Sequence, residues 1–85
     1  MEPEIALGIV LKSLRKQRKL SQESLAHEAG IERNYVSLLE LGRSSASIKM
    51  LFKIAPVLGV TVSELVNQVE ILLLADSQTG KSSIN

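Results

Sequence analysis

Apolar residues recur along this chain at spacings of three and four residues, the period of an amphipathic α-helix. Leu7, Val10, Leu11 and Leu14 form the first such stripe, and later segments repeat the pattern. No segment alternates apolar and polar residues as a half-buried β-strand does. With 85 residues, of which 45% are hydrophobic, the chain can build one small core. We therefore predict a single all-α domain.

Capping residues and helix-ending residues divide the first half of the chain into three predicted helices. The first helix ends in a basic cluster at residues 12–19, where cations complement the helix dipole. Ser21 is a good N-cap for the second helix, and Gly30 ends it. The third helix is predicted from Glu32 to Leu41.

Two further helices are predicted in the second half. Ser47 caps the fourth helix, and Pro56 inside that helix should kink or shorten it. Thr61 or Ser63 caps the fifth helix. The composition then turns polar, so we predict a domain over residues 1–75 and a flexible tail over residues 76–85.

The composition excludes several classes of function. The chain has no cysteine and one histidine, so we expect no disulfide and no metal site. The longest apolar run, Ile71 to Ala75, is far too short to cross a membrane. No spacing of Ser, His and acidic residues suggests catalysis, so we expect no enzyme. The net charge is only +1, but residues 1–20 hold five basic residues against two acidic ones. A polyanionic partner would therefore meet a local basic patch.

Residues 22–41 have the spacing of two helices that cross closely. Ala26 is small where the helices would touch, and Gly30 falls where the tight turn between them is needed. Leu25, Val36 and Leu39 supply the apolar contacts of such a pair. This arrangement resembles the helix-turn-helix of bacterial and phage regulators.

Three motifs extend the resemblance to the Cro and lambda-repressor-like (Xre-type) family. Residues 20–26 read Leu-Ser-Gln-Glu-Ser-Leu-Ala, and residues 40–43 read Glu-Leu-Gly-Arg. Residues 54–60 read Ile-Ala-Pro-Val-Leu-Gly-Val, with a leucine following at Leu65. The match spans about residues 11–65. It implies a five-helix, lambda-repressor-like domain that binds double-stranded DNA as a homodimer.

The resemblance also implies roles for individual residues. The implied base-reading residues lie on the third helix, and a structural ion pair would tie the first helix to the third and orient it. The base-reading set is Glu32, Arg33, Asn34 and Ser37; the phosphate-contacting set is Lys16, Gln22, Tyr35 and Arg43; the ion pair is Arg15 with Glu40. Arginine can pair with guanine and asparagine with adenine through two hydrogen bonds each.

The sequence departs from the family pattern at several positions. Lys19 stands where many members have glycine, which should cost up to about 1 kcal/mol. Leu38 and Leu41 are apolar where polar residues are usual, and Leu38 either touches a thymine methyl group or packs against the protein. Residues 44–46 replace a loop that often holds Arg, Asn and Pro, so one contact to the DNA backbone does not follow from the resemblance.

The last predicted helix carries an apolar arc wider than a small domain needs for its own core. The arc either completes that core or extends it across a two-fold dimer seam, and we predict the seam. The predicted seam residues are Leu65, Val66, Val69, Leu72 and Leu73.

We therefore predict a sequence-specific transcriptional regulator that binds a near-palindromic operator as a homodimer and regulates its own promoter. The run at residues 32–37 is similar to that of restriction–modification controller proteins. Small phage repressors are the other group of small regulators that this sequence resembles. We expect no cofactor, no small-molecule effector and a cytoplasmic location in a bacterial host, at the nucleoid when DNA is bound. The alternative is an antitoxin or adaptor that uses this fold mainly to bind another protein.

Overall fold

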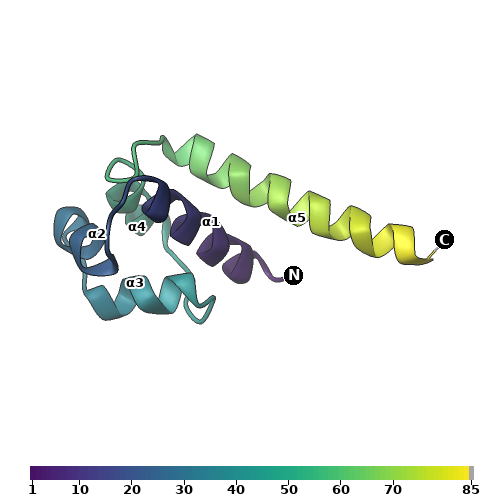
Figure 1. The fold of residues 1–85 in the computed structure, drawn as a ribbon, viewed down its shortest axis with the longest axis horizontal. Helices are drawn as coiled ribbons and strands as arrows, with labels where there is room; N and C mark the ends of the chain where they lie inside the picture. The colour runs from purple at the N-terminus through teal and green to yellow at the C-terminus, as the bar shows by residue number, and fades with distance from the viewer. Residues whose placement is uncertain (85) are drawn as a thin grey trace.

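A computed structural model describes the backbone of residues 1–84 and the side chains of residues 1–77. It contains five helices and, within those residues, no strand (Figure 1). The helices are α1 (Pro3–Gln17), α2 (Gln22–Ala29), α3 (Arg33–Glu40), α4 (Ile48–Ile54) and α5 (Val62–Ile84). The predicted all-α, five-helix class is confirmed.

Polar caps begin three of these helices as the sequence indicates. The hydroxyl of Ser21 accepts a hydrogen bond from the N–H of Ser24 at 3.0 Å. Ser47 accepts one from the N–H of Met50 at 3.1 Å. At α5, Thr61 is the N-cap, and it exchanges two hydrogen bonds with Glu64, at 2.8 and 3.0 Å. Reciprocal bonds of this kind satisfy two N–H groups that a helix start otherwise leaves unpaired.

The turn between α2 and α3 depends on Gly30. Its φ of +71° lies in the left-handed region, which glycine enters without the steric penalty of a Cβ. The N–H of Ile31 then returns to the carbonyl of Ala26 at 2.9 Å, which closes the end of α2. The chain can therefore turn sharply and start α3 against α2.

Pro56 shortens α4 and does not kink it. The helix ends at Ile54, with Ala55 as its C-cap, so the proline lies beyond the last turn. The segment that follows is a series of turns, yet it still places Leu58 in the core at 2% exposure.

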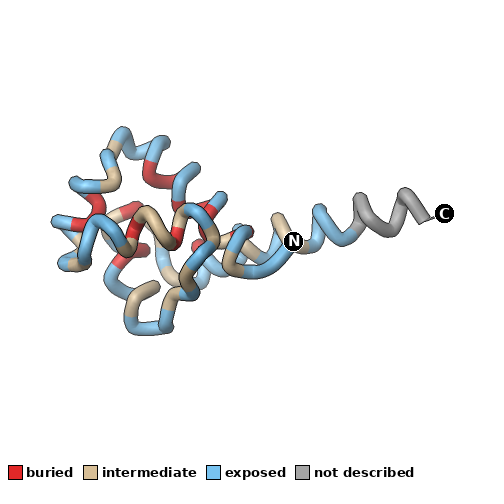
Figure 2. The backbone as a smooth tube through the Cα atoms, turned by 90° about the horizontal axis from the view of Figure 1, so that it is seen from below, coloured by how far each residue is buried: buried red, intermediate tan, exposed pale blue. Residues whose placement is uncertain are grey.

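One core lies among all five helices (Figure 2). Its largest fully buried side chains come from every helix: Leu11, Leu25, Val36, Leu39, Ile54 and Leu65. Helix α1 packs against both α3 and α5, and α2 packs against α3 and α4. In Figure 1, α5 runs back alongside α1, and α3 lies on the other side of α1. Helix α3 is the one that the family resemblance implies would read DNA.

Helix α5 is longer than predicted, since its backbone stays helical to Ile84. No proline follows Pro56, and a single glycine at residue 80 costs a helix only about 1 kcal/mol. A flexible tail was predicted for residues 76–85. Most of these residues have side chains that lie outside the described part of the chain. No helix in the described residues is both long enough and apolar enough to span a membrane.

Candidate nucleic-acid interface

Helix α3 buries apolar side chains on one side and exposes polar ones on the other. Val36 and Leu39 are buried, at 1% and 0% exposure, and they fix which side of the helix faces inward. At 3.6 residues per turn, Asn34 and Ser37 fall on the outer side, and Arg33 falls at its edge in the first turn. Arg33 and Asn34 are exposed and Ser37 is half-buried. None of these three side chains has a hydrogen bond or ion pair within the described residues, so their polar groups are available to a ligand.

Glu32 sits at the N-cap of α3 without capping it. Its carboxylate is exposed and makes no hydrogen bond to the first N–H groups of the helix. The start of α3 thus presents an acidic and a basic side chain next to each other, Glu32 and Arg33.

A buried ion pair holds α3 against α1. Arg15 Nε donates to Glu40 Oε2 at 2.6 Å, and Arg15 Nη2 donates to Glu40 Oε1 at 3.0 Å. The Arg15 and Glu40 side chains are only 9% and 2% exposed. Arg15 Nη1 also donates to the carbonyl of Leu20 at 2.8 Å, which closes the end of α1. The hydrogen bond to Glu40 raises the pKa of the Arg15 guanidinium above its usual value.

Gln22 joins this network from the first turn of α2. Its amide nitrogen donates to Glu40 Oε1 at 3.0 Å, so one carboxylate links α1, α2 and α3. The family resemblance implies a phosphate contact for Gln22 but not this internal bond. Only the remaining amide proton and the backbone N–H groups at the helix start stay available to an anion.

Tyr35 makes a different contact from the predicted one. Its hydroxyl donates to the carbonyl of Ser45 at 2.8 Å, and its ring is half-buried. A phenol has one proton to donate, so in this arrangement none remains for a phosphate. In the chain without DNA, Tyr35 holds the loop after α3 in place, and the phosphate contact implied by the resemblance stays a prediction that requires this bond to open.

The remaining predicted phosphate contacts, Lys16 and Arg43, are both exposed side chains. Arg43 follows α3 directly, and its N–H donates to the carbonyl of Leu38 at 3.0 Å. That bond fixes the direction in which the chain leaves the helix. Neither side chain has an internal partner in the described residues, so both charges face solvent.

The α5 residues predicted for a dimer seam divide into three groups. Leu65 is fully buried, so its prediction as a seam residue is wrong; it belongs to the chain's own core because its turn of α5 faces α1 and α4. Val66 and Val69 line a groove between α1, α4 and α5. Leu72 packs against the core and lines the opposite side of α5, and Leu73 is half-buried.

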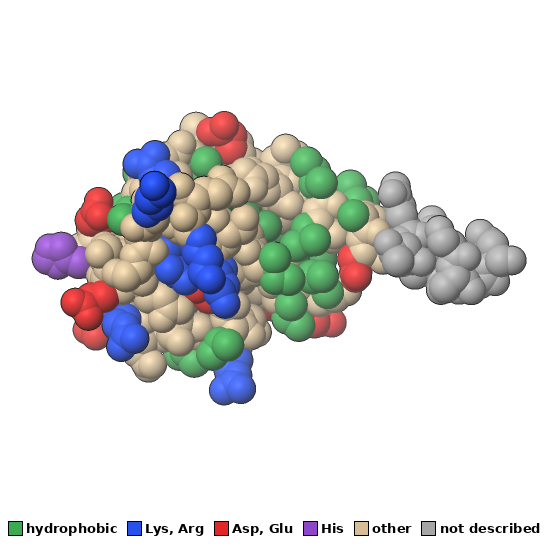
Figure 3. All heavy atoms as spheres, in the orientation of Figure 1, with side chains coloured by type: hydrophobic (Ala, Val, Ile, Leu, Met, Phe, Trp, Pro, Cys, Tyr) green, Lys and Arg blue, Asp and Glu red, His purple; other side chains and the backbone are tan. Residues whose placement is uncertain are grey.

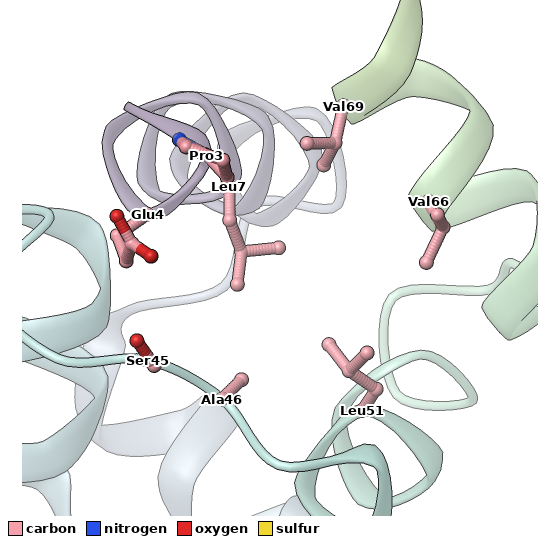
Figure 4. A pocket seen from close by; sticks show the side chains of 8 residues that line it. All are labelled: Pro3, Glu4, Leu7, Ser45, Ala46, Leu51, Val66 and Val69. Carbon is pink, nitrogen blue, oxygen red and sulfur yellow. The ribbon is translucent and has the colours of Figure 1, made fainter. Parts of the chain in front are cut away.

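Two apolar surfaces flank α5. The α1–α4–α5 groove is lined by Pro3, Glu4, Leu7, Ser45, Ala46, Leu51, Val66 and Val69 (Figure 4). The α1–α5 face is lined by Ile9, Val10, Ser13, Gln68, Ile71, Leu72 and Ala75. Figure 3 shows hydrophobic side chains gathered where α1 and α5 run side by side.

Sequence reasoning missed the most exposed apolar side chains of α4. Ile48 is 72% exposed and Phe52 is 63% exposed, and they lie one turn apart on the same side of the helix. The available signal was crowding, since five of the seven α4 residues are apolar and a helix that short cannot bury them all. Gly8 was also missed; it is buried where α1 touches the end of α3.

Comparisons with known proteins agree with this arrangement. The sequence profile of a family described as helix-turn-helix matches residues 11–65. The control protein C.MunI of a Mycoplasma species is 43% identical over 68 residues, which make up 79% of this chain and 92% of that protein. Two solved structures are similar over most of this chain. The restriction–modification controller protein C.AhdI from Aeromonas hydrophila has a TM-score of 0.71 and 35% identity, over 73% of this chain and 94% of that one. SinR, described as a master regulator for biofilm formation and solved in complex with DNA, has a TM-score of 0.68 and 34% identity, over 71% and 97%.

Proposed function

Because the chain belongs to the helix-turn-helix family of transcriptional regulators, we propose that it binds a specific, nearly palindromic DNA operator as a homodimer. The observation that carries the proposal is the division of α3 into two sides. Its inner side is fixed by the core and by the Arg15–Glu40 pair, and its outer side presents Arg33, Asn34 and Ser37 without internal partners. A helix presented in this way can enter the major groove and read base edges.

Each outer residue has a base that matches its chemistry. Arg33 can pair with guanine through O6 and N7, and Asn34 with adenine through N6 and N7. Glu32 can accept from the amino group of cytosine, and Ser37 can pair with either kind of edge. Lys16, Arg43 and the first turn of α2 at Gln22 would then contact phosphates on either side of the groove.

The base and phosphate roles predict different losses on substitution. Arg33→Ala should weaken operator binding by about 1–3 kcal/mol and relax the preference at one base pair. Arg43→Ala should weaken binding to all sequences alike and reduce the salt dependence by about one counterion. Binding curves at several salt concentrations, on matched operator and mutant duplexes, separate the two patterns. An Arg43 loss confined to one base position, or an Arg33 loss equal at all sequences, would contradict these assignments.

We further propose that the dimer forms through α4 and the first turns of α5. Ile48 and Phe52 are the exposed apolar residues of α4, and Val66 and Val69 of α5 line the α1–α4–α5 groove with Leu51 of α4. Burying these side chains would remove the largest exposed apolar groups of α4 from water. A two-fold dimer would place two copies of α3 about one DNA turn apart, roughly 34 Å.

Matched charge substitutions test this seam against the other apolar surface. Phe52 and Ile71 are similarly exposed, at 63% and 56%, so glutamate at either position should leave the fold intact. Phe52→Glu should give monomers in sedimentation, with weakened operator binding, whereas Ile71→Glu should stay dimeric. The reverse result would move the seam to the α1–α5 face.

The function itself is tested by selecting duplexes from a random pool with purified protein at physiological salt. We expect a two-fold symmetric consensus, which should also occur upstream of the protein's own gene if it controls its own promoter. Such a regulator would act in the cytoplasm, without an effector, through its own concentration. Weak, salt-sensitive binding with no consensus would instead favour the antitoxin or adaptor function.

A further inference from the structure

The outer side of α3 is not entirely polar. At helical spacing, Leu38 follows Asn34 by one turn and Leu41 follows it by two, so all three share one side. Leu38 is half-buried and Leu41 is 60% exposed. Neither residue lines the α1–α4–α5 groove or the α1–α5 face, so neither belongs to the apolar surfaces that flank α5.

Leucine on a DNA-reading surface can contact few groups of the base edges favourably. The 5-methyl group of thymine is the one apolar group on the base edges of the major groove, and the other positions there are hydrogen-bond donors or acceptors. A leucine pressed against a donor or acceptor would displace its water without replacing the hydrogen bond, which is unfavourable. Against a thymine methyl group, the same leucine removes apolar surface from water on both partners.

We propose that Leu38 and Leu41 read thymine 5-methyl groups, so that part of the operator preference comes from apolar contact. This inference rests on the proposed DNA-reading function and adds two residues to the reading set. Asn34 lies on the same side of α3 and offers the hydrogen bonds that recognise adenine. Asn34 and the two leucines together would therefore favour neighbouring A·T pairs.

Uracil in place of thymine tests the contact without changing the protein. Uracil keeps every hydrogen-bonding group of thymine and lacks only the methyl group. Burial of one methyl group contributes about 0.8 kcal/mol, which corresponds to about a fourfold change in Kd. We expect a single thymine-to-uracil change in one half-site to weaken binding about fourfold at one or two positions, measured by fluorescence anisotropy on the selected operator.

The leucine variants then assign each position. Leu38→Ala should bind the thymine and uracil duplexes equally at the position it contacts, while keeping the difference elsewhere. Leu41→Ala should do the same at a neighbouring position, and its exposed site makes misfolding no concern. Ile71→Ala, which removes an exposed apolar side chain from the α1–α5 face, should keep the whole uracil pattern.

The failures of the two proposals are distinguishable. If the operator binds tightly and no uracil change weakens it, the methyl-reading inference is overturned and the regulator function stands. The inference is also overturned if uracil weakens binding equally in the wild type and in both leucine variants. If no operator is selected at all, the DNA-reading function fails and the inference fails with it.

Discussion

Replacing Gly8 with alanine should destabilise this protein, although the same change normally stabilises a helix. Gly8 lies inside α1, and a methyl group added there would sit 2.5 Å from the carbonyl oxygen of Leu39 and 2.6 Å from that of Glu40. Both atoms belong to the backbone at the end of α3, so neither can rotate away as a side chain would. Helix α3 must therefore move away from α1.

The magnitude is the difference between two opposing effects. Gly-to-Ala in a helix interior favours folding by about 1 kcal/mol. Overpacking of a close contact costs about 1–3 kcal/mol. The cost at Gly8 should lie at the upper end of that range, because the atoms that the new methyl group would meet belong to the backbone of α3. We therefore expect Gly8→Ala to lose about 2 kcal/mol of unfolding free energy. In a domain of this size the thermal midpoint should fall by roughly 8–16 °C.

Urea and thermal unfolding followed by circular dichroism measure the loss. Lys12 is an exposed residue of the same helix, so the difference between Lys12→Ala and Lys12→Gly gives the helix-propensity effect alone. Operator binding should fall as well, because α3 carries the reading residues away from their positions. A Gly8→Ala protein as stable as its parent would refute the close contact between α1 and α3.

Three further predictions concern stability. Lys19 has a φ of +57°, so Lys19→Gly should relieve a left-handed strain of about 1–2 kcal/mol. After the entropy cost of glycine, the unfolding free energy measured in urea should rise by about 0.5–1 kcal/mol. A fall in that free energy would contradict the strain. Glu40→Ala leaves the buried Arg15 without its carboxylate and should cost about 3–5 kcal/mol, whereas replacing both residues with leucine should cost much less. Hydrogen bonds from Thr61 lower the pKa of Glu64, so its contribution is complete above the ordinary carboxyl pKa and is lost as pH falls through the lowered value. Glu64→Gln should therefore flatten the acid limb of stability against pH, and an unchanged limb would exclude this capping carboxylate.

The fold was predictable because local signals agree with one another. Periodicity locates the five helices, and the caps at Ser21 and Ser47 together with the turn at Gly30 set several of their ends. What periodicity cannot assign is the inward side of a helix whose apolar residues cover more than one face. Phe52 therefore escaped notice, and Leu65 was placed on the surface although its neighbours bury it completely.

The family resemblance predicted one internal bond of the candidate site, the Arg15–Glu40 pair, but not the others. The outward position of Asn34 follows from helical spacing once Val36 and Leu39 are known to face inward, and Arg33 is exposed because it begins the helix. The bonds from Gln22 to Glu40 and from Tyr35 to Ser45 join residues 18 and 10 positions apart. Such contacts depend on how the helices are packed, and no local pattern in the sequence specifies them.

The network that joins Arg15, Gln22 and Glu40 uses none of the side chains Arg33, Asn34 and Ser37 that we propose to read bases. On that proposal, folding energy and base choice depend on separate sets of side chains within one eight-residue helix. Arg33 and Asn34 can be exchanged without disturbing a single internal hydrogen bond of the described chain. If α3 reads DNA as proposed, a gene encoding this scaffold can acquire a new operator by a few substitutions, without first passing through an unstable protein.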